Sequence, residues 1–181
     1  MVFHAIAAQR LFDTLVQSLR VLGRLHGDPN PGNVLINAGA ELALLDFGCT
    51  RWLPGDIQLL VLRLLRSAVA GDDEAAHQAC RDMGVFAGLS EAQARQVDAA
   101  SLRPFWDWVA VPLREPVYDF GADPGHLAKG RRLFLQLLRD DALAQLRPEL
   151  VLLNRTLYGQ YRIFERLGAR VRCQGLWSAM S

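Results

Sequence analysis

Two polar stretches joined by a short predicted hairpin constrain the fold of this chain more than any other feature. The first stretch, His26-Gly27-Asp28-Pro29-Asn30-Pro31-Gly32-Asn33, ends where the apolar run 34–36 begins, and the second, Asp46-Phe47-Gly48, follows the apolar run 42–45. Residues 37–40 are turn formers, so the two runs are predicted to pair as a β-hairpin. A hairpin returns the chain to its starting point and therefore brings the two polar stretches together.

The rest of the chain is predicted to be mainly helical, because apolar residues recur at steps of three and four. Predicted helices cover residues 3–25, 56–70, 72–83, 90–102, 126–146 and 148–167. Segment 104–125 contains four prolines and is predicted to be a long loop with one short helix near 106–109, anchored by the buried aromatics Trp106, Trp108, Tyr118 and Phe120. The fold class is thus mainly α with one small β-hairpin.

No internal linker is long enough to separate two domains, so residues 1–181 are expected to form one domain. Its parts are an N-terminal helix over 1–25, the loop, hairpin and turn over 26–48, and a helical region over 49–181.

The formal net charge of +1, from 20 basic and 19 acidic residues, excludes a field that gathers nucleic acid. The three cysteines form no paired framework, which favours a reducing, cytoplasmic location. The longest apolar stretch, 57–70, is interrupted by two arginines, so we expect at most peripheral contact with a membrane.

The residue types of the two polar stretches suit phosphoryl transfer. Such chemistry needs a carboxylate near the incoming nucleophile, a role open to Asp28 as the catalytic residue. It also needs oxygen ligands for the Mg²⁺ that bridges the phosphates, roles open to Asn33 and Asp46. Gly48 allows close approach of the backbone to the bound cofactor. The order His26, Asp28, Asn33, hairpin, Asp-Phe-Gly is the order in which protein-kinase-like folds place these groups, and there the histidine is expected to support the Asp-Phe-Gly turn rather than to act as a base.

At these residues the chain resembles the UbiB-type family of atypical kinase-like proteins, which is tied to ubiquinone biosynthesis. Residues 28–33 match the family's Asp-Pro-x-Pro-Gly-Asn loop, with Asn30 where the commonest form has histidine. Residues 44–51, Leu-Leu-Asp-Phe-Gly-Cys-Thr-Arg, are similar to a run of its mitochondrial coenzyme Q branch, and 115–121 and 155–171 are similar to that branch's C-terminal helical region. The resemblance implies the C-terminal, large lobe of a protein-kinase-like fold, with ATP and Mg²⁺ as cofactors.

The resemblance also implies a small lobe, encoded upstream, that supplies a lysine to the phosphates. Only 25 residues precede His26, and the single lysine of the chain is Lys129, so we expect the small lobe to be absent and ATP binding by the chain alone to be weak. The expected partners are a chain that bears a small lobe, or proteins of quinone biosynthesis. The expected function is an atypical kinase or ATPase contributing Mg-ATP chemistry to isoprenoid-quinone synthesis; the alternatives are a catalytically silent binding module and a truncated fragment of a longer gene.

Four further features have simple structural interpretations. Cys49, beside the Asp-Phe-Gly turn, is expected to be a small buried residue rather than a redox-active thiol. His77 and His126 lack neighbours at the spacing of a zinc site. The pair Arg131-Arg132 is expected to be a solvated helix face. Asn30 is expected to be a turn residue.

Overall fold

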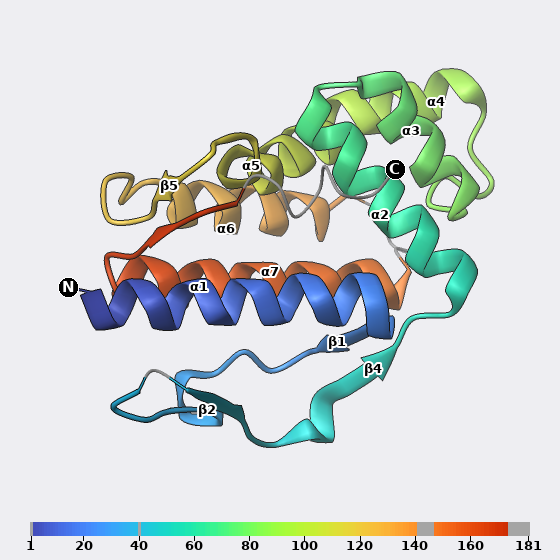
Figure 1. The fold of residues 1–181 in the computed structure, drawn as a ribbon. Coiled ribbons are helices and arrows are strands. Elements are labelled where there is room, and N and C mark those ends of the chain that lie inside the picture. The colour runs from blue at the N-terminus through green and yellow to red at the C-terminus, as the bar shows by residue number, and fades with distance from the viewer. Residues whose placement is uncertain (1, 40, 141–146, 174–181) are drawn as a thin grey trace.

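Two long helices cross the middle of the molecule in opposite directions. The strands of residues 24–52 lie on one side of them, and the remaining helices lie on the other side with the strands of residues 118–119 and 170–171 (Figure 1). The computed structural model describes residues 2–39, 41–140 and 147–173. The helices are α1 (Val2–Gln17), α2 (Gly55–Ala70), α3 (Asp73–Asp82), α4 (Glu91–Val97), α5 (Arg103–Arg114), α6 (His126–Leu137) and α7 (Pro148–Arg166). The strands are β1 (Arg24–His26), β2 (Val34–Ile36), β3 (Leu42–Leu44), β4 (Thr50–Trp52), β5 (Tyr118–Asp119) and β6 (Arg170–Val171).

The predicted hairpin is confirmed and pairs β2 with β3 in antiparallel register, Val34 opposite Leu44 and Ile36 opposite Leu42. The structure adds two antiparallel pairs that the sequence did not indicate, β1 with β4 and β5 with β6. Each of these strands has only two or three residues, too few to show an alternating pattern. The β1–β4 pair closes the loop region at its base, because it holds the segment before the first polar stretch against the segment after the second.

The N-terminal helix ends earlier than predicted. α1 continues through a π-helical turn at Ser18–Leu22 and stops at Gly23, whose φ of +58° is the left-handed conformation that terminates helices. Arg24–His26 is therefore strand rather than helix. Leu53 N–H donates to the carbonyl oxygen of Gly23 at 2.7 Å, which fastens this corner to the end of β4.

The predicted helices at the centre of the chain are confirmed, with one correction. Segment 104–125 was expected to be a loop with a short helix, but Arg103–Arg114 forms the full helix α5, which follows α4 through a π-helical turn at Asp98–Leu102. Pro104 lies at the N-terminal end of α5, directly after the π-helical turn. Pro112 lies inside the helix, and burial of a wide apolar face outweighs its cost there. The loop prediction holds from residue 115 onwards, and all four aromatic anchors are buried as predicted.

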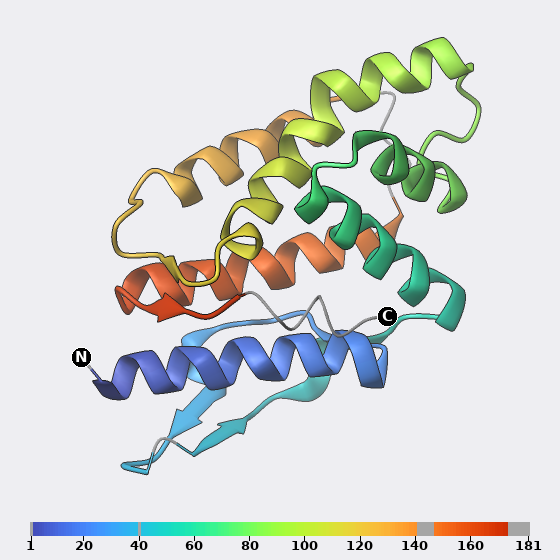
Figure 2. The ribbon, with the colours of Figure 1, turned by 45° about the horizontal axis from the view of Figure 1, so that its top comes forward.

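One hydrophobic core runs through α1, α2, α5 and α7, and its aromatic part lies between α5, α6 and α7. Trp108 is fully buried and its Nε1–H donates to the carbonyl oxygen of His126 at 2.8 Å. Tyr161 on α7 donates its hydroxyl to the carbonyl oxygen of Val109 at 2.9 Å. α6 packs closely against α5 because Gly130 lies on the Trp108 ring. Residues 141–146 of the predicted helix 126–146 lie outside the described residues, and α6 itself ends at Leu137. Figure 2 shows α7 between α1 and this helical layer.

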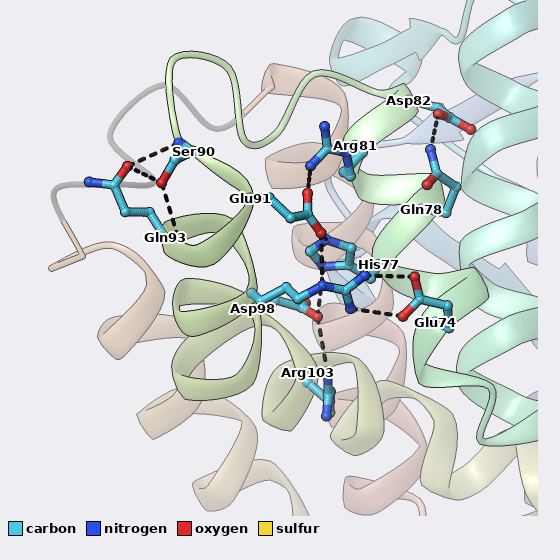
Figure 3. A network of polar contacts seen from close by, with 11 residues as sticks. Glu74, His77, Gln78, Arg81, Asp82, Ser90, Glu91, Gln93, Asp98 and Arg103 are labelled. Atoms are coloured by element: carbon cyan, nitrogen blue, oxygen red, sulfur yellow. Dashed lines mark hydrogen bonds and ion pairs between the residues drawn. The ribbon is translucent and has the colours of Figure 1, made fainter.

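A polar network joins α3 to α4 and α5, and it accounts for His77 without a metal (Figure 3). The His77 side chain is 1% exposed, and its Nδ1 lies 3.0 Å from Oδ2 of Asp98. Arg103 reaches the same carboxylate at 3.4 Å, and Arg95 binds both oxygens of Glu74. Among the described residues no group of three or more His, Cys, Asp or Glu side chains could hold a metal ion.

Arg131 and Arg132 are exposed on α6, as predicted. None of the helices in residues 2–39, 41–140 and 147–173 is long and apolar enough to cross a membrane.

Candidate functional site

The loop at residues 27–33 presents Asp28 with both carboxylate oxygens engaged. Oδ2 accepts a hydrogen bond from Nδ2 of Asn33 at 3.0 Å, and Oδ1 forms an ion pair with Nη2 of Arg155 at 3.1 Å. Each carboxylate oxygen can accept more than one hydrogen bond, so both retain capacity for a further donor. Asp28 is half-buried and is held in place from two sides.

The hairpin places Asn33 beside the Asp-Phe-Gly turn, as the sequence predicted. The N–H of Leu45 donates to the carbonyl oxygen of Asn33 at 2.8 Å, so Asn33 lies next to the residue that precedes Asp46. Because the Asn33 amide nitrogen faces Asp28, its Oδ1 is the oxygen left for another ligand. Asn30 is a turn residue, as predicted, and its Oδ1 accepts the N–H of Gly32 at 3.1 Å.

Asp46 has an unusual backbone conformation. Its φ of +54° is the only positive value at a non-glycine residue in the described part of the chain. The left-handed conformation costs an L-residue roughly 1–2 kcal/mol, although aspartate tolerates it better than most. Oδ1 of Asp46 accepts the N–H of Gly48 at 3.1 Å, which caps the turn, and the carboxylate is exposed. Strain of this kind is typical of functional positions.

His26 contacts the Asp-Phe-Gly turn, the place where the sequence predicted it to give support. Its Nε2 lies 3.2 Å from the carbonyl oxygen of Leu45, the residue before Asp46. Its ring meets the ring of Phe47 edge to face, with 5.8 Å between centroids. Phe47 itself is 63% exposed, so its other face is open to a ligand or partner.

Helix α7 supports the loop from behind, which sequence reasoning missed. Gly159 lets Pro29 approach so closely that a Cβ at position 159 would lie 2.1 Å from Cγ of Pro29. Gly27 likewise lies against Leu152, with a Cβ at 27 meeting Cδ1 of that leucine at 2.4 Å. Arg155, one turn before Gly159, supplies the ion pair to Asp28. The available signal was Gly159 itself, because a glycine inside an otherwise regular helical pattern usually has a packing reason.

Two cavities flank the site. One, of about 490 Å³, lies between the loop 28–31 and the face of α7 that carries Arg155, Arg162 and Arg166. The other, of about 560 Å³, lies on the side of Phe47 and is lined by side chains from the π-helical turn after α1 and from β1, β3 and β4, Trp52 among them. Trp52 is 65% exposed and stacks on the guanidinium of Arg24 at 5.0 Å.

The chain contains a second Asp-Phe-Gly triplet, at residues 119–121, and the structure separates the two. Phe120 is buried at 2% exposure, whereas Phe47 is exposed. Asp119 caps its turn by accepting the N–H groups of Gly121 and Ala122, and it lies 3.6 Å from Arg170. The second triplet is therefore a structural turn of the β5 region.

Cys49 corrects a sequence expectation, because its side chain is exposed rather than buried. Cys49 is the last residue of a single 3-10 turn at the surface. Its backbone carbonyl is held in place because it accepts a hydrogen bond from the N–H of Gly27 at 3.2 Å. Cys80 and Cys173 are buried. Burial raises the pKa of the Cys80 thiol well above its ordinary value and that of Cys173 to about 12.

The donor set at the base of the hairpin fits Mg²⁺. Asp46 offers a carboxylate and Asn33 an amide oxygen, and both are the hard oxygen ligands that Mg²⁺ prefers. Sites for Mg²⁺ with a nucleotide usually take only one or two protein side chains, because phosphates and water complete the octahedron. The hydrogen bond from Nδ2 of Asn33 to Asp28 and the hydrogen bond that caps the Asp46 turn each fix the side chain that would supply a donor.

Comparison with known proteins shows which family the chain is similar to. The model of the ABC1 atypical kinase-like domain matches residues 4–80, which contain the loop, the hairpin and the Asp-Phe-Gly turn. The mitochondrial atypical kinase COQ8 of Schizosaccharomyces pombe is 29% identical over 168 residues, covering 91% of this chain and 27% of that protein. The putative ABC transporter A445L of Paramecium bursaria Chlorella virus 1 is 32% identical over 79 residues, covering 44% of this chain and 17% of that protein.

The fold is also found among solved structures. The Rv3197–erythromycin complex from Mycobacterium tuberculosis matches with a TM-score of 0.68 at 19% identity, covering 96% of this chain and 42% of that one. The chain therefore spans less than half the length of each of these three proteins. The resemblance to the UbiB-type atypical kinase-like family is confirmed, and residues 4–80 of this chain match the ABC1 atypical kinase-like domain.

Proposed function

We propose that this chain provides the catalytic-loop lobe of an atypical kinase or ATPase that uses MgATP, and that it acts in isoprenoid-quinone biosynthesis. The observation that carries the proposal is the hydrogen bond between Leu45 N–H and the Asn33 carbonyl oxygen. It holds the loop of Asp28 and the turn of Asp46 at one end of the hairpin. The match to the ABC1 domain and to COQ8 supports kinase-like function at the level of the family.

In this proposal Asn33 and Asp46 hold Mg²⁺, which when bound neutralises charge on the phosphates of ATP. Asp28 orients the hydroxyl of an acceptor, or a water molecule, and takes its proton. The acceptor oxygen forms a bond to the γ-phosphorus while the bond from that phosphorus to the bridging oxygen breaks, and ADP leaves. Asn33 keeps the Asp28 carboxylate pointed at the acceptor, because its Nδ2 binds Oδ2.

The test uses Asp46→Asn, with Asp119→Asn as the matched control from the second Asp-Phe-Gly turn. Mn²⁺ with ATP is added to the ¹⁵N-labelled 181-residue chain, because paramagnetic broadening detects a metal even at low occupancy. We expect broadening first at residues 33 and 45–48, and a loss of at least ten-fold in nucleotide-dependent broadening for Asp46→Asn alone. Asparagine tolerates the left-handed conformation, so the metal-free stability of this variant should stay the same or rise slightly.

Two outcomes oppose the proposal. Unchanged broadening in Asp46→Asn shows that Asp46 does not bind metal. Unfolding of Asp46→Asn in the absence of metal shows that the aspartate serves the turn. In either case the chain is better described as a catalytically silent binding module.

A further inference from the structure

The cavity between the loop and α7 has an excess of positive charge. Three arginines line it, Arg155, Arg162 and Arg166, and Asp28 is the only acidic residue among its lining side chains. Arg155 is paired with Asp28, whereas Arg162 and Arg166 form no ion pair with a carboxylate within the described residues. The cavity therefore carries two uncompensated guanidinium groups.

Arg162 and Arg166 are four residues apart on α7, so they lie on the same face about 6 Å apart along the axis. Like charges at this spacing destabilise a helix by a few tenths of a kcal/mol. An anion placed between them removes that repulsion, and guanidinium groups match the oxygens of phosphate in a two-pronged geometry. The volume of about 490 Å³ is that of a small-molecule site.

The positions of the three arginines along α7 set the distance that a ligand in this cavity must span. Arg155 marks the level of Asp28, and Arg162 lies seven residues further on, about 10 Å along the axis. Tyr158, Gly159 and Pro29 line the cavity between these two levels. A molecule with a hydroxyl at Asp28 thus meets Arg162 about 10 Å and Arg166 about 16 Å further along the helix axis.

We propose that this cavity binds a phosphate-bearing organic molecule, with its phosphate or diphosphate on Arg162 and Arg166 and a hydroxyl directed at Asp28. Its role as the phosphoryl acceptor rests on the proposed function, but the anion site stands on its own observations. The phosphate belongs either to a soluble metabolite or to a lipid headgroup, and the two share the same chemistry at the arginines.

The experiment titrates the ¹⁵N-labelled 181-residue chain with inorganic pyrophosphate in the presence of EDTA. Without divalent cations, pyrophosphate cannot bind through a metal at Asn33 and Asp46. A negative result in this titration therefore does not test the metal proposal, and a negative result in the Mn²⁺ experiment does not test this site. We expect saturable shifts at residues 155–166 and at Asp28 and Asn30. The double variant Arg162→Gln with Arg166→Gln should bind pyrophosphate at least ten-fold more weakly.

Arg132→Gln is the matched control, since Arg132 is an exposed arginine on α6 that does not line this cavity. It should leave the affinity unchanged. Absence of saturable shifts overturns the proposal. An equal loss of affinity in Arg132→Gln also overturns it, because binding then depends on the overall positive charge and not on this cavity. Thermal unfolding of each variant shows that the fold is retained, which the exposure of all three substituted arginines favours.

A second arm identifies the source of the phosphate. Vesicles of phosphatidylcholine with and without phosphatidic acid are sedimented with the wild-type chain and with the double variant. Sedimentation that needs both phosphatidic acid and the two arginines supports the site and assigns it to a lipid headgroup. Saturable pyrophosphate binding without such sedimentation supports the site and assigns it to a soluble phosphate.

Discussion

Gly159→Ala tests how strongly the conformation of the loop at residues 27–33 depends on its packing against α7. The added Cβ would lie 2.1 Å from Cγ of Pro29, whereas carbon atoms normally approach to about 3.5–4.0 Å. Pro29 must therefore move away by about 1.5 Å or α7 must shift. Overpacking of this size costs about 1–3 kcal/mol, and the better helix propensity of alanine returns about 1 kcal/mol. The expected net loss in the free energy of unfolding is about 0–2 kcal/mol.

The larger effect should be on the loop itself. Because Pro29 follows Asp28 directly, a displaced Pro29 weakens the ion pair between Asp28 and Arg155. We expect changed amide shifts at residues 26–33 in Gly159→Ala, measured beside urea unfolding. A displacement near 1 Å at a catalytic group can reduce a rate about 100-fold, so any nucleotide turnover should fall far more than stability.

Gly130→Ala is the matched control. Its Cβ would lie 2.2 Å from the ring of the buried Trp108, so the steric conflict and the gain in helix propensity are similar. We expect a comparable or greater loss of stability, because the ring is enclosed, but no shift at residues 26–33. If Gly159→Ala is stabilised by the full 1 kcal/mol and its loop amides do not move, the reasoning about α7 is refuted.

Three further predictions concern other parts of the chain. Burial lowers the pKa of His126 from 6.5 to about 4, so between these pH values the unfolded state binds more protons than the folded state. The free energy of unfolding should therefore fall by about 2 kcal/mol as the pH drops from 6.5 to 4, after allowance for partial solvent access. Urea unfolding across this range should show the loss, and a His126→Gln variant should lack most of it. Cys49 alone should react rapidly with a thiol reagent in the folded chain; a second fast equivalent contradicts the burial of the other two thiols. Trp52 and Phe47 expose apolar area beside the same cavity, so we expect light scattering to show self-association of the chain and Trp52→Ser to reduce it; a monomeric chain, or an unchanged oligomer size in the variant, argues against that surface.

The parts of the fold encoded locally could be predicted from sequence. The hairpin and its two polar ends followed from neighbouring residues, and the stops at Gly71 and Gly168 followed from the glycine that each helix end needs, as their φ values of +71° and +55° show. Helix α5 was missed because its prolines suggested a loop. Burial of the apolar face of α5 decided the outcome, and such burial depends on what the rest of the chain places opposite it.

The candidate site likewise contains residues that the local sequence predicts and one residue that it does not. Asp28, Asn33 and Asp46 lie within 18 positions of one another, and their order alone predicted that they meet. Arg155 lies 127 positions from Asp28, and no spacing rule connects the two. Its role follows only from the way α7 packs behind the loop. The exposure of Cys49 was equally beyond local pattern, since it depends on which side of the turn faces solvent.

The contact between α7 and the loop has a consequence for how the chain acquires its site during synthesis. Residues 26–33 leave the ribosome well before residues 152–159, so the loop has neither its glycine contact nor its arginine partner until the last long helix is made. Contacts this distant in sequence form late, because closing a long loop costs entropy. A nascent chain that ends before Pro148 would carry the whole segment matched by the ABC1 domain, yet Asp28 would lack its ion pair with Arg155.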